Sequence, residues 1–182
     1  MAVFSRRGRK LALTAHICAS VGWLGAIAGF LALAVTGFLT ENGQVVRAAF
    51  LGMDWIGWYV LVPISFASLV TGLIQSLGTD WGLFRHYWVV AKLLINVLAN
   101  IVLLMYMVQL SSVVTTLPSH DVSGFRSASP VLHASVALVL LLVASVLAVF
   151  KPRGVTPYGW RKLQERRWRA RQERQRSAPS HS

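Results

Sequence analysis

Three ionisable side chains lie inside long apolar stretches of this 182-residue chain: His16, Lys92 and His133. An ionisable group in an apolar surrounding is costly, so such residues commonly bind ions, protons or cofactors. Imidazole nitrogens bind metals and exchange protons near neutral pH. Asn96 and Asn100 follow Lys92 at intervals of four residues in the segment FRHYWVVAKLLINVLAN. Because residues four apart share one face of a helix, this spacing predicts a polar stripe on a helix.

The composition around these residues is that of a membrane protein. The chain is 55% hydrophobic and only 13% charged, whereas about a quarter of the residues of a soluble domain are charged. Thirty uncharged residues separate Lys10 from Glu41, and twenty-five separate Asp54 from Asp80. About 20 apolar helical residues cross the hydrocarbon core of a bilayer, in which the backbone must satisfy its own hydrogen bonds. We therefore predict an all-α fold, a four-helix transmembrane bundle with spans at about 12–36, 55–78, 87–110 and 131–150.

This division predicts a basic N-terminal arm at 1–10, a four-span membrane domain at 11–150 and a basic tail at 151–182. The first apolar stretch is longer than the roughly 7–15 residues of a signal-peptide core, so we interpret it as a span. The 40–54 loop can hold a short helix around Val45–Gly52, and Pro63 is expected to kink span 2.

The distribution of lysine and arginine predicts the orientation. Fifteen basic residues lie in the N-terminal arm, the 79–86 loop and the tail, against two in the other loops, Arg47 and Arg126. The positive-inside rule then places both termini in the cytoplasm, here of a bacterial inner membrane. The basic tail directly follows a span, which favours binding to anionic inner-leaflet lipids over binding to nucleic acid.

The depth of each residue in its span decides which side chains can meet. His16 and Lys92 both lie roughly 7–8 Å inside the inner end of a span, by the helical rise of 1.5 Å per residue. His133 lies near the outer face, roughly 20 Å away along the membrane normal, so it cannot share a metal with His16. Trp23 is one heptad after His16, and Gly22, Gly25 and Gly29 are expected to allow close helix packing.

These positions suggest haem b bound between spans 1 and 3. His16 would be the axial ligand of the iron, and Trp23 and Asn96 would line the site. Lys92 would be a sixth ligand or would pair the propionates together with Arg85 and His86. An alternative outer site consists of Met105, Met107 and His133, whose thioether and imidazole groups suit copper or a second haem.

Each of these residues also has a purely structural explanation. His16 can hydrogen-bond to a neighbouring helix, and Lys92 can extend to the inner headgroups. The two asparagines can bond to span 2, and methionines commonly fill space next to lipid. The candidate partners in span 2 are Ser65, Ser68, Thr71 and Gln75.

Three segments resemble a family of bacterial integral membrane proteins of unknown function, over about residues 9–160: HICASVGWLG, WGLFRHYWVVAK and KPRGVTPYGW. More remotely, His16 followed by Trp-x-Gly and the Trp-x-x-x-Lys that ends at Lys92 resemble CopD-type copper-resistance proteins and HemJ-type protoporphyrinogen oxidases. The HemJ resemblance implies haem b held by a histidine, together with a required lysine. Members of the closer family often carry a histidine near the outer end of span 3, where this chain has Met105-Tyr106-Met107. That departure argues against a bis-histidine outer site.

Two classes of function follow. The first is a haem-binding membrane redox protein, in which His16 and Lys92 must face one cavity. The second is a non-catalytic membrane protein, either a copper-handling permease component or a structural subunit of a membrane partner or homo-oligomer. The sequence leaves open whether the protein is an enzyme.

Overall fold

The computed structural model describes residues 5–78, 86–117, 127–150, 154 and 156–177. The elements within them are α1 (Arg6–Leu39), α2 (Gly43–Ile56), the π-helical segment η1 (Gly57–Leu61), α3 (Val62–Gly78), α4 (Tyr87–Thr116), α5 (Ser129–Phe150) and α6 (Pro157–Ser177). No strand occurs in this described part of the chain. The predicted all-α, four-helix class is confirmed. The ranges 12–36, 87–110 and 131–150 fall within α1, α4 and α5, whereas 55–78 runs from the end of α2 through η1 and α3.

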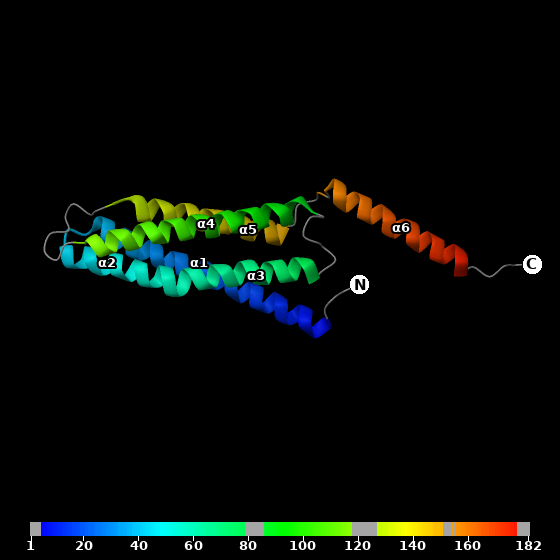
Figure 1. Cartoon of the computed structure of the whole chain (residues 1–182), viewed down its shortest axis with the longest axis horizontal. Helices are drawn as coiled ribbons and strands as arrows, with labels where there is room; N and C mark the ends of the chain where they lie inside the picture. Colours follow the sequence, from blue (N-terminus) through cyan, green and yellow to red (C-terminus); the bar gives the residue numbers. More distant parts are fainter. Residues whose placement is uncertain (1–4, 79–85, 118–126, 151–153, 155, 178–182) are drawn as a thin grey trace, which may run out of the picture.

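The four long helices form an elongated bundle (Figure 1). Helix α1 packs against α3 and α5, and α4 packs against the same two helices. Helices α1 and α4 therefore lie at diagonally opposite corners of the bundle. This order means that side chains of α1 and α4 can meet only across the bundle axis.

Four helical segments are long and apolar enough to cross a membrane: Arg7–Leu39, Gly43–Leu77, Tyr87–Thr116 and Ser129–Phe150. Large apolar side chains cover their outer faces, for example Leu98 on α4 and Val149 on α5. An outer surface of this kind is suited to lipid and not to water. The chain is thus a multi-pass membrane protein.

Helix α1 faces the core with a single stripe of residues. Its buried positions recur every three or four residues, the spacing of one helix face. They are His16, Ala19, Trp23, Ile27, Phe30, Ala34 and Gly37. This stripe places His16 and Trp23 inside the bundle, as their spacing of one heptad predicts.

The segment predicted as the 40–54 loop is mostly helix. The Asn42 side chain accepts a hydrogen bond from the Gln44 N–H and caps α2, which continues through η1 into α3 without a loop. The expected short helix is therefore present, but the loop after it is not. The reason is that Val46, Phe50 and Met53 recur at helical spacing and are buried in the core.

Pro63 is accompanied by a π-helical turn directly before it. The Val62 N–H donates to the Gly57 carbonyl, five residues back, instead of to a carbonyl four residues back. Proline has no N–H to donate, and π-turns are a common way to accommodate the interrupted ladder. Glycine at position 57 leaves room for Met107, whose side chain would have to shift if a Cβ were present here.

Helix α6 leaves the bundle at the end where the N-terminus lies (Figure 1). The buried Thr156 begins it, since its hydroxyl accepts from the Gly159 N–H at 3.1 Å. The two termini therefore share one end of the bundle, as an even number of spans requires. Which side of the membrane that end faces remains a prediction from the positive-inside rule.

Candidate functional site

His16 and Lys92 are in contact at the centre of the bundle. The Lys92 Nζ lies 3.2 Å from the His16 Nε2, a hydrogen-bonding distance. His16 is buried, with 7% of its surface exposed, and Lys92 is partly buried. The sequence places these two residues at the same depth, and the structure brings them into contact although spans 1 and 3 are not neighbours. The flexible four-carbon stem of the lysine crosses the diagonal between α4 and α1.

Helix α3 holds the other side of the imidazole. His16 Nδ1 lies 3.2 Å from Thr71 Oγ1, whose own hydroxyl proton is donated to the Ala67 carbonyl at 2.6 Å. The threonine oxygen must then accept, so Nδ1 carries a proton and donates it. This assigns the Nδ1–H tautomer and leaves Nε2 as the acceptor for Lys92.

Gly72 lets α3 come this close to the histidine. A Cβ at Gly72 would lie 3.1 Å from His16 Cε1, which is tighter than ordinary van der Waals contact. By contrast, a Cβ at Gly25 or Gly29 would meet nothing within 4 Å. The expectation that those two glycines serve close packing within the bundle is therefore wrong, because both lie on an exposed face of α1. Gly22 does pack closely, against Ile64.

A ladder of short polar side chains continues from this pair through the bundle. Ser20 and Ser68 link α1 to α3 at 3.0 Å, and Ser65 donates to Asn100 Oδ1 at 2.8 Å. The amide groups of Asn96 and Asn100 each donate to the carbonyl four residues earlier on α4. Hydrogen bonding between helices thus accounts for Asn100, as expected, whereas the Asn96 amide donates to the Lys92 carbonyl within α4.

Two residues at this site were not predicted from the sequence. Gly72 and Ser20 gave no individual signal, because a small residue in a span is ordinary. Thr71 and Ser68 were expected to face the asparagines of α4, but their hydroxyls instead contact α1. Ser65, Ser68 and Thr71 recur every three residues and so form one polar face of α3. Which neighbouring helix each of them contacts depends on the rotation of α3, which only the tertiary structure shows.

The pair as arranged does not fit a haem iron held by both side chains. Metal–nitrogen bonds of about 2 Å would require the two nitrogens to stand about 4 Å apart, and they stand 3.2 Å apart. Both imidazole nitrogens already have partners, so His16 could bind iron only after Lys92 moved away. Among the described residues, no group of three or more His, Cys, Asp or Glu side chains converges as a metal site.

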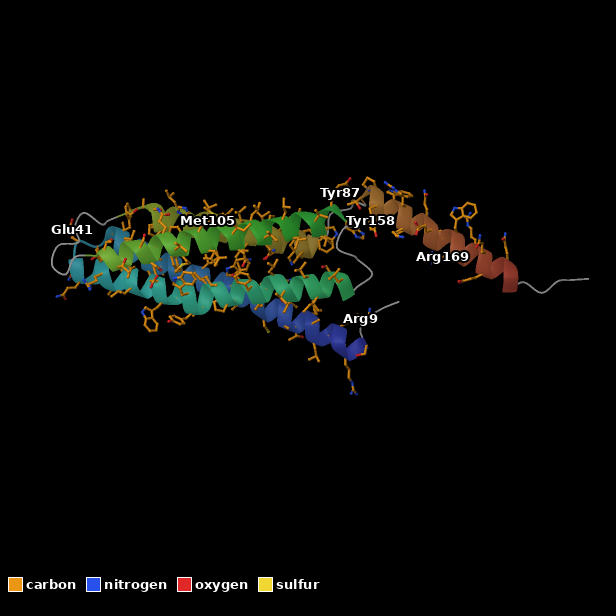
Figure 2. All side chains as sticks on the ribbon, in the orientation of Figure 1. Arg9, Glu41, Tyr87, Met105, Tyr158 and Arg169 are labelled. Carbon is orange, nitrogen blue, oxygen red and sulfur yellow. The ribbon has the colours of Figure 1, made fainter. Side chains whose placement is uncertain are left out.

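The residues of the alternative outer site do not converge. Met105 is 69% exposed and points away from the bundle (Figure 2), whereas Met107 is fully buried against Gly57. Two residues apart on a helix point about 200° apart, so these thioethers cannot share a ligand with His133. His133 instead stacks on Tyr106, with ring centroids 4.5 Å apart.

The remaining predicted residues lie at the ends of the helices or in the core. Arg85 lies outside the described residues. His86 precedes the first residue of α4, where its carbonyl accepts from the Val89 N–H, and its ring lies 6.4 Å from that of Trp88. Trp23 is 98% buried and lines a cavity.

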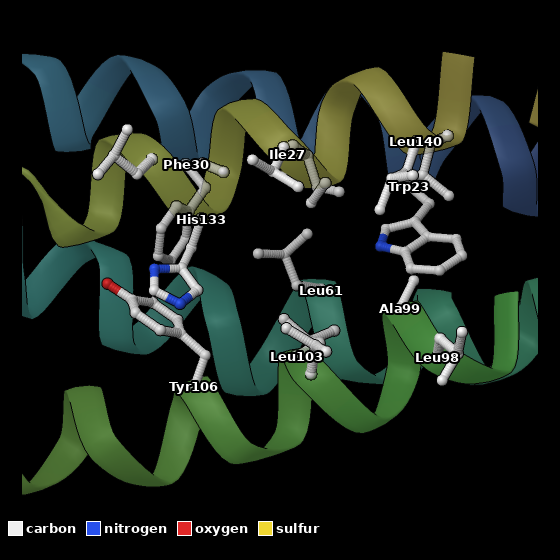
Figure 3. Close-up of a pocket in the computed structure, with 16 residues that line it drawn as sticks. Trp23, Ile27, Phe30, Leu61, Leu98, Ala99, Leu103, Tyr106, His133 and Leu140 are labelled. Carbon is white, nitrogen blue, oxygen red and sulfur yellow. The ribbon is translucent and has the colours of Figure 1, made fainter. Parts of the chain in front are cut away.

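This cavity has a volume of about 330 Å³ and lies between α1, α4 and α5 (Figure 3). Its lining is almost entirely apolar, and His16 is not part of it. Trp23 and Leu140 lie at one end, and Phe30, Tyr106 and His133 at the other. The bundle therefore has two separate features, a polar pair toward the end at which α1 begins and an apolar cavity farther along α1.

The chain was compared with protein-family models, with curated proteins and with solved structures, and none of the three comparisons found a match. The resemblance to CopD-type and HemJ-type proteins therefore stays a prediction.

Proposed function

We propose that this membrane protein binds and transfers a proton at the His16–Lys92 pair. The observation that supports the proposal is the 3.2 Å contact between Nζ and Nε2 inside the bundle. A hydrogen bond between two nitrogen bases needs one donor and one acceptor, so a proton lies between two groups that can both hold it. Such pairs within a membrane domain are typical of proton-handling sites.

The transfer itself needs no large movement. The ammonium of Lys92 gives one proton to His16 Nε2, leaving a neutral amine on the lysine and an imidazolium on the histidine. The imidazolium keeps its Nδ1–H bond to Thr71, which stabilises the added charge. The neutral lysine can then turn toward the inner headgroups, about 8 Å away along α4, and regain a proton there.

This step combines two interpretations of Lys92 that the sequence left open. In this proposal the Lys92 side chain moves between two positions, one in contact with His16 and one extended toward the headgroups. Lysine is suited to this role, because its stem is flexible and its ammonium carries three donors. Arginine would not be, since its guanidinium does not lose a proton in proteins.

The test is ¹⁵N NMR of histidine-labelled protein in lipid nanodiscs, with His16→Phe used to assign the His16 signals. We expect an Nδ1–H tautomer whose Nε2 signal moves in Lys92→Met, because the donor to Nε2 is lost. Over the pH range in which the protein stays folded, the pair should take up or release one proton. If His16 and the Lys92 amine both keep one protonation state throughout, the pair is structural and the proposal is wrong.

A visible absorption spectrum of the same purified protein tests whether it binds haem. A Soret band that disappears in His16→Ala would replace the proton-transfer proposal by the haem-binding one. The absence of that band in protein expressed with ample haem would leave the proton proposal as it stands.

We also propose that the shared end of the bundle faces the cytoplasm of a bacterial inner membrane. Helix α6 carries eight lysines and arginines against two glutamates, and its side chains project into free space (Figure 2). Each basic residue near an anionic leaflet contributes about 1 kcal/mol of attraction. The tail would thus bind anionic lipid and anchor the orientation.

A further inference from the structure

We propose that the cavity between α1, α4 and α5 binds a lipophilic carbonyl compound that enters from the bilayer, a membrane-soluble ketone or quinone. The proposal does not depend on proton transfer at His16 and Lys92, because the cavity and the pair share no residue. It rests on three observations: where the cavity opens, one buried donor that it contains, and the depth of that donor.

The cavity opens toward lipid. Six of its lining residues are also exposed on the outer face of the bundle. One is His133, and the other five are aliphatic: Leu98, Val102, Leu132, Val136 and Leu140. They belong to α4 and α5, so the entrance lies between these two helices. An entrance of this kind admits molecules dissolved in the bilayer and not ions or polar solutes.

The buried donor is the indole nitrogen of Trp23. Its N–H is the one buried side-chain polar group without a hydrogen-bond partner in the described part of the chain. Figure 3 shows this nitrogen turned toward the other lining residues of the cavity. A buried tryptophan N–H normally has a partner, and indole only donates. A bound molecule must therefore bring an acceptor oxygen.

The depth of Trp23 excludes a phospholipid as the source of that oxygen. Trp23 is seventeen residues after Arg6 and sixteen before Leu39, which places it at the middle of α1. Phospholipid ester carbonyls stay near the interface, about 15 Å from the centre of a 30 Å hydrocarbon core. An acceptor at mid-depth belongs to a molecule that dissolves wholly in the core, as ketones and quinones with long apolar tails do.

The shape and the lining agree with a flat ring. The volume of about 330 Å³ lies at the lower end of the range for small-molecule sites. From Trp23 the cavity extends about 10 Å along α5 to His133, the length of the seven residues from His133 to Leu140. Aromatic rings stand at both ends, Trp23 at one and the stacked pair of Tyr106 and His133 at the other.

The test uses a short-chain ubiquinone that carries a diazirine on its tail, crosslinked to the protein in lipid nanodiscs and mapped by mass spectrometry. Unlabelled decylubiquinone competes and gives the apparent affinity. We expect crosslinks concentrated on the facing sides of α4 and α5. Trp23→Phe, which keeps the apolar volume and removes the donor, should weaken competition about tenfold. Trp160→Phe, on α6, is the matched control and should change nothing.

Two further measurements separate a carbonyl site from an unspecific apolar cavity. Ala137→Phe and Ala99→Leu fill the cavity from α5 and α4, and either variant that keeps the wild-type melting temperature should lose the competed crosslinks. A diazirine-tagged alkylbenzene, which has no acceptor, should be insensitive to Trp23→Phe. If the quinone is equally insensitive, or if its crosslinks spread over every lipid-facing helix, the inference is wrong.

Discussion

At the scale of single residues, contacts with two helices, α3 and α4, set the position and the hydrogen bonds of the His16 ring. Thr71 on α3 holds Nδ1, Lys92 on α4 reaches Nε2, and the backbone of Gly72 limits the space beside the ring. The imidazole thus has one tautomer and one orientation, as a proton acceptor needs. Removing either partner leaves a buried polar group unsatisfied, which usually destabilises a protein by about 1–3 kcal/mol.

Coupling between His16 and Lys92 can be measured directly. A double-mutant cycle of His16→Phe and Lys92→Met should give a favourable interaction free energy of about 1 kcal/mol, because contacting polar partners commonly couple by about 0.5–3 kcal/mol. Reversible unfolding in mixed micelles provides the free energies. The control cycle pairs His16→Phe with Lys162→Met on α6 and should be additive; equal results from the two cycles would contradict the contact.

Thr71→Val removes the acceptor for His16 Nδ1 and changes little in shape. We expect a loss of about 1 kcal/mol in the free energy of unfolding, together with a shift toward the other imidazole tautomer in the ¹⁵N spectrum. Thr36→Val is the matched control, since the exposed Thr36 hydroxyl bonds only to the Ala32 carbonyl of its own helix. A Thr71→Val protein with an unchanged tautomer would refute the assignment of Nδ1–H.

At the scale of helices, small residues decide which faces come together. Glycine at positions 57 and 72 admits Met107 and His16, whereas glycine at 25 and 29 meets no side chain of the bundle. Sequence spacing alone suggested the opposite importance, because a Gly-x-x-x-Gly pair is a familiar sign of close helix packing. The structure instead assigns that role to Gly22 of α1, Gly57 of η1 and Gly72 of α3.

Alanine substitutions test this assignment. Gly57→Ala places a methyl group against Met107 and should destabilise the bundle by about 1–3 kcal/mol, the usual effect of overpacking. Gly25→Ala should be neutral or stabilising by up to about 1 kcal/mol, since alanine favours helix and nothing lies in its way. Thermal unfolding of the two variants in the same detergent compares them; a larger loss in Gly25→Ala would contradict the packing described.

Helix α6 differs from the other helices because it is basic and lies outside the bundle. One ion pair within it joins Lys162 to Glu165 at 2.8 Å, and this lysine lowers the pKa of the Glu165 carboxyl. The pair therefore persists at neutral pH and is lost as the pH falls through the acid range. The excess of arginine remains available for an anionic surface.

Lipid composition should change the protection of α6. In nanodiscs with anionic lipid, its backbone amides should exchange more slowly than in zwitterionic nanodiscs, because the arginines hold the helix at the surface. Added salt should reduce the difference, since exposed charges are screened beyond about 8 Å at physiological ionic strength. Hydrogen exchange read by mass spectrometry measures both effects. Equal protection in the two lipids would show that α6 does not bind the leaflet.

At the scale of the whole molecule, both chain ends leave from one end of the bundle (Figure 1). The basic residues gather at that same end, in the N-terminal arm and α6. The arrangement puts the His16–Lys92 pair near the basic end and the apolar cavity at mid-depth and beyond. Proton exchange would thus occur from the predicted cytoplasmic side, while lipophilic molecules would enter sideways.

Reporter fusions test this orientation. Alkaline phosphatase fused after Ser182 should be inactive and green fluorescent protein at the same position fluorescent, because the positive-inside rule retains the basic end in the cytoplasm. Phosphatase fused after Leu39, at the other end of α1, should be active. The reverse pattern at both positions would invert the predicted topology.

The sequence alone determined the class of the protein, its four helices and the depth of its polar residues. Charge spacing and apolar length suffice for this, because lipid enforces helices of a minimum length. Counting residues from the end of each span also predicts that His16 and Lys92 lie at the same depth. The rotation of each helix and the order of helices around the axis were decided only by tertiary packing. Hydropathy is nearly uniform around a span, so it does not specify which face meets which neighbour.

That packing accounts for what the sequence missed. Packing brings Lys92 into contact with His16 across the bundle axis and places Thr71 beside His16 instead of beside the asparagines. It also leaves Met105 exposed and Met107 buried. It also left the Trp23 N–H without a partner beside a cavity open to lipid. Residues distant in sequence meet only when side-chain volumes and small-residue contacts fix the helix rotations, and this information is spread over the whole core.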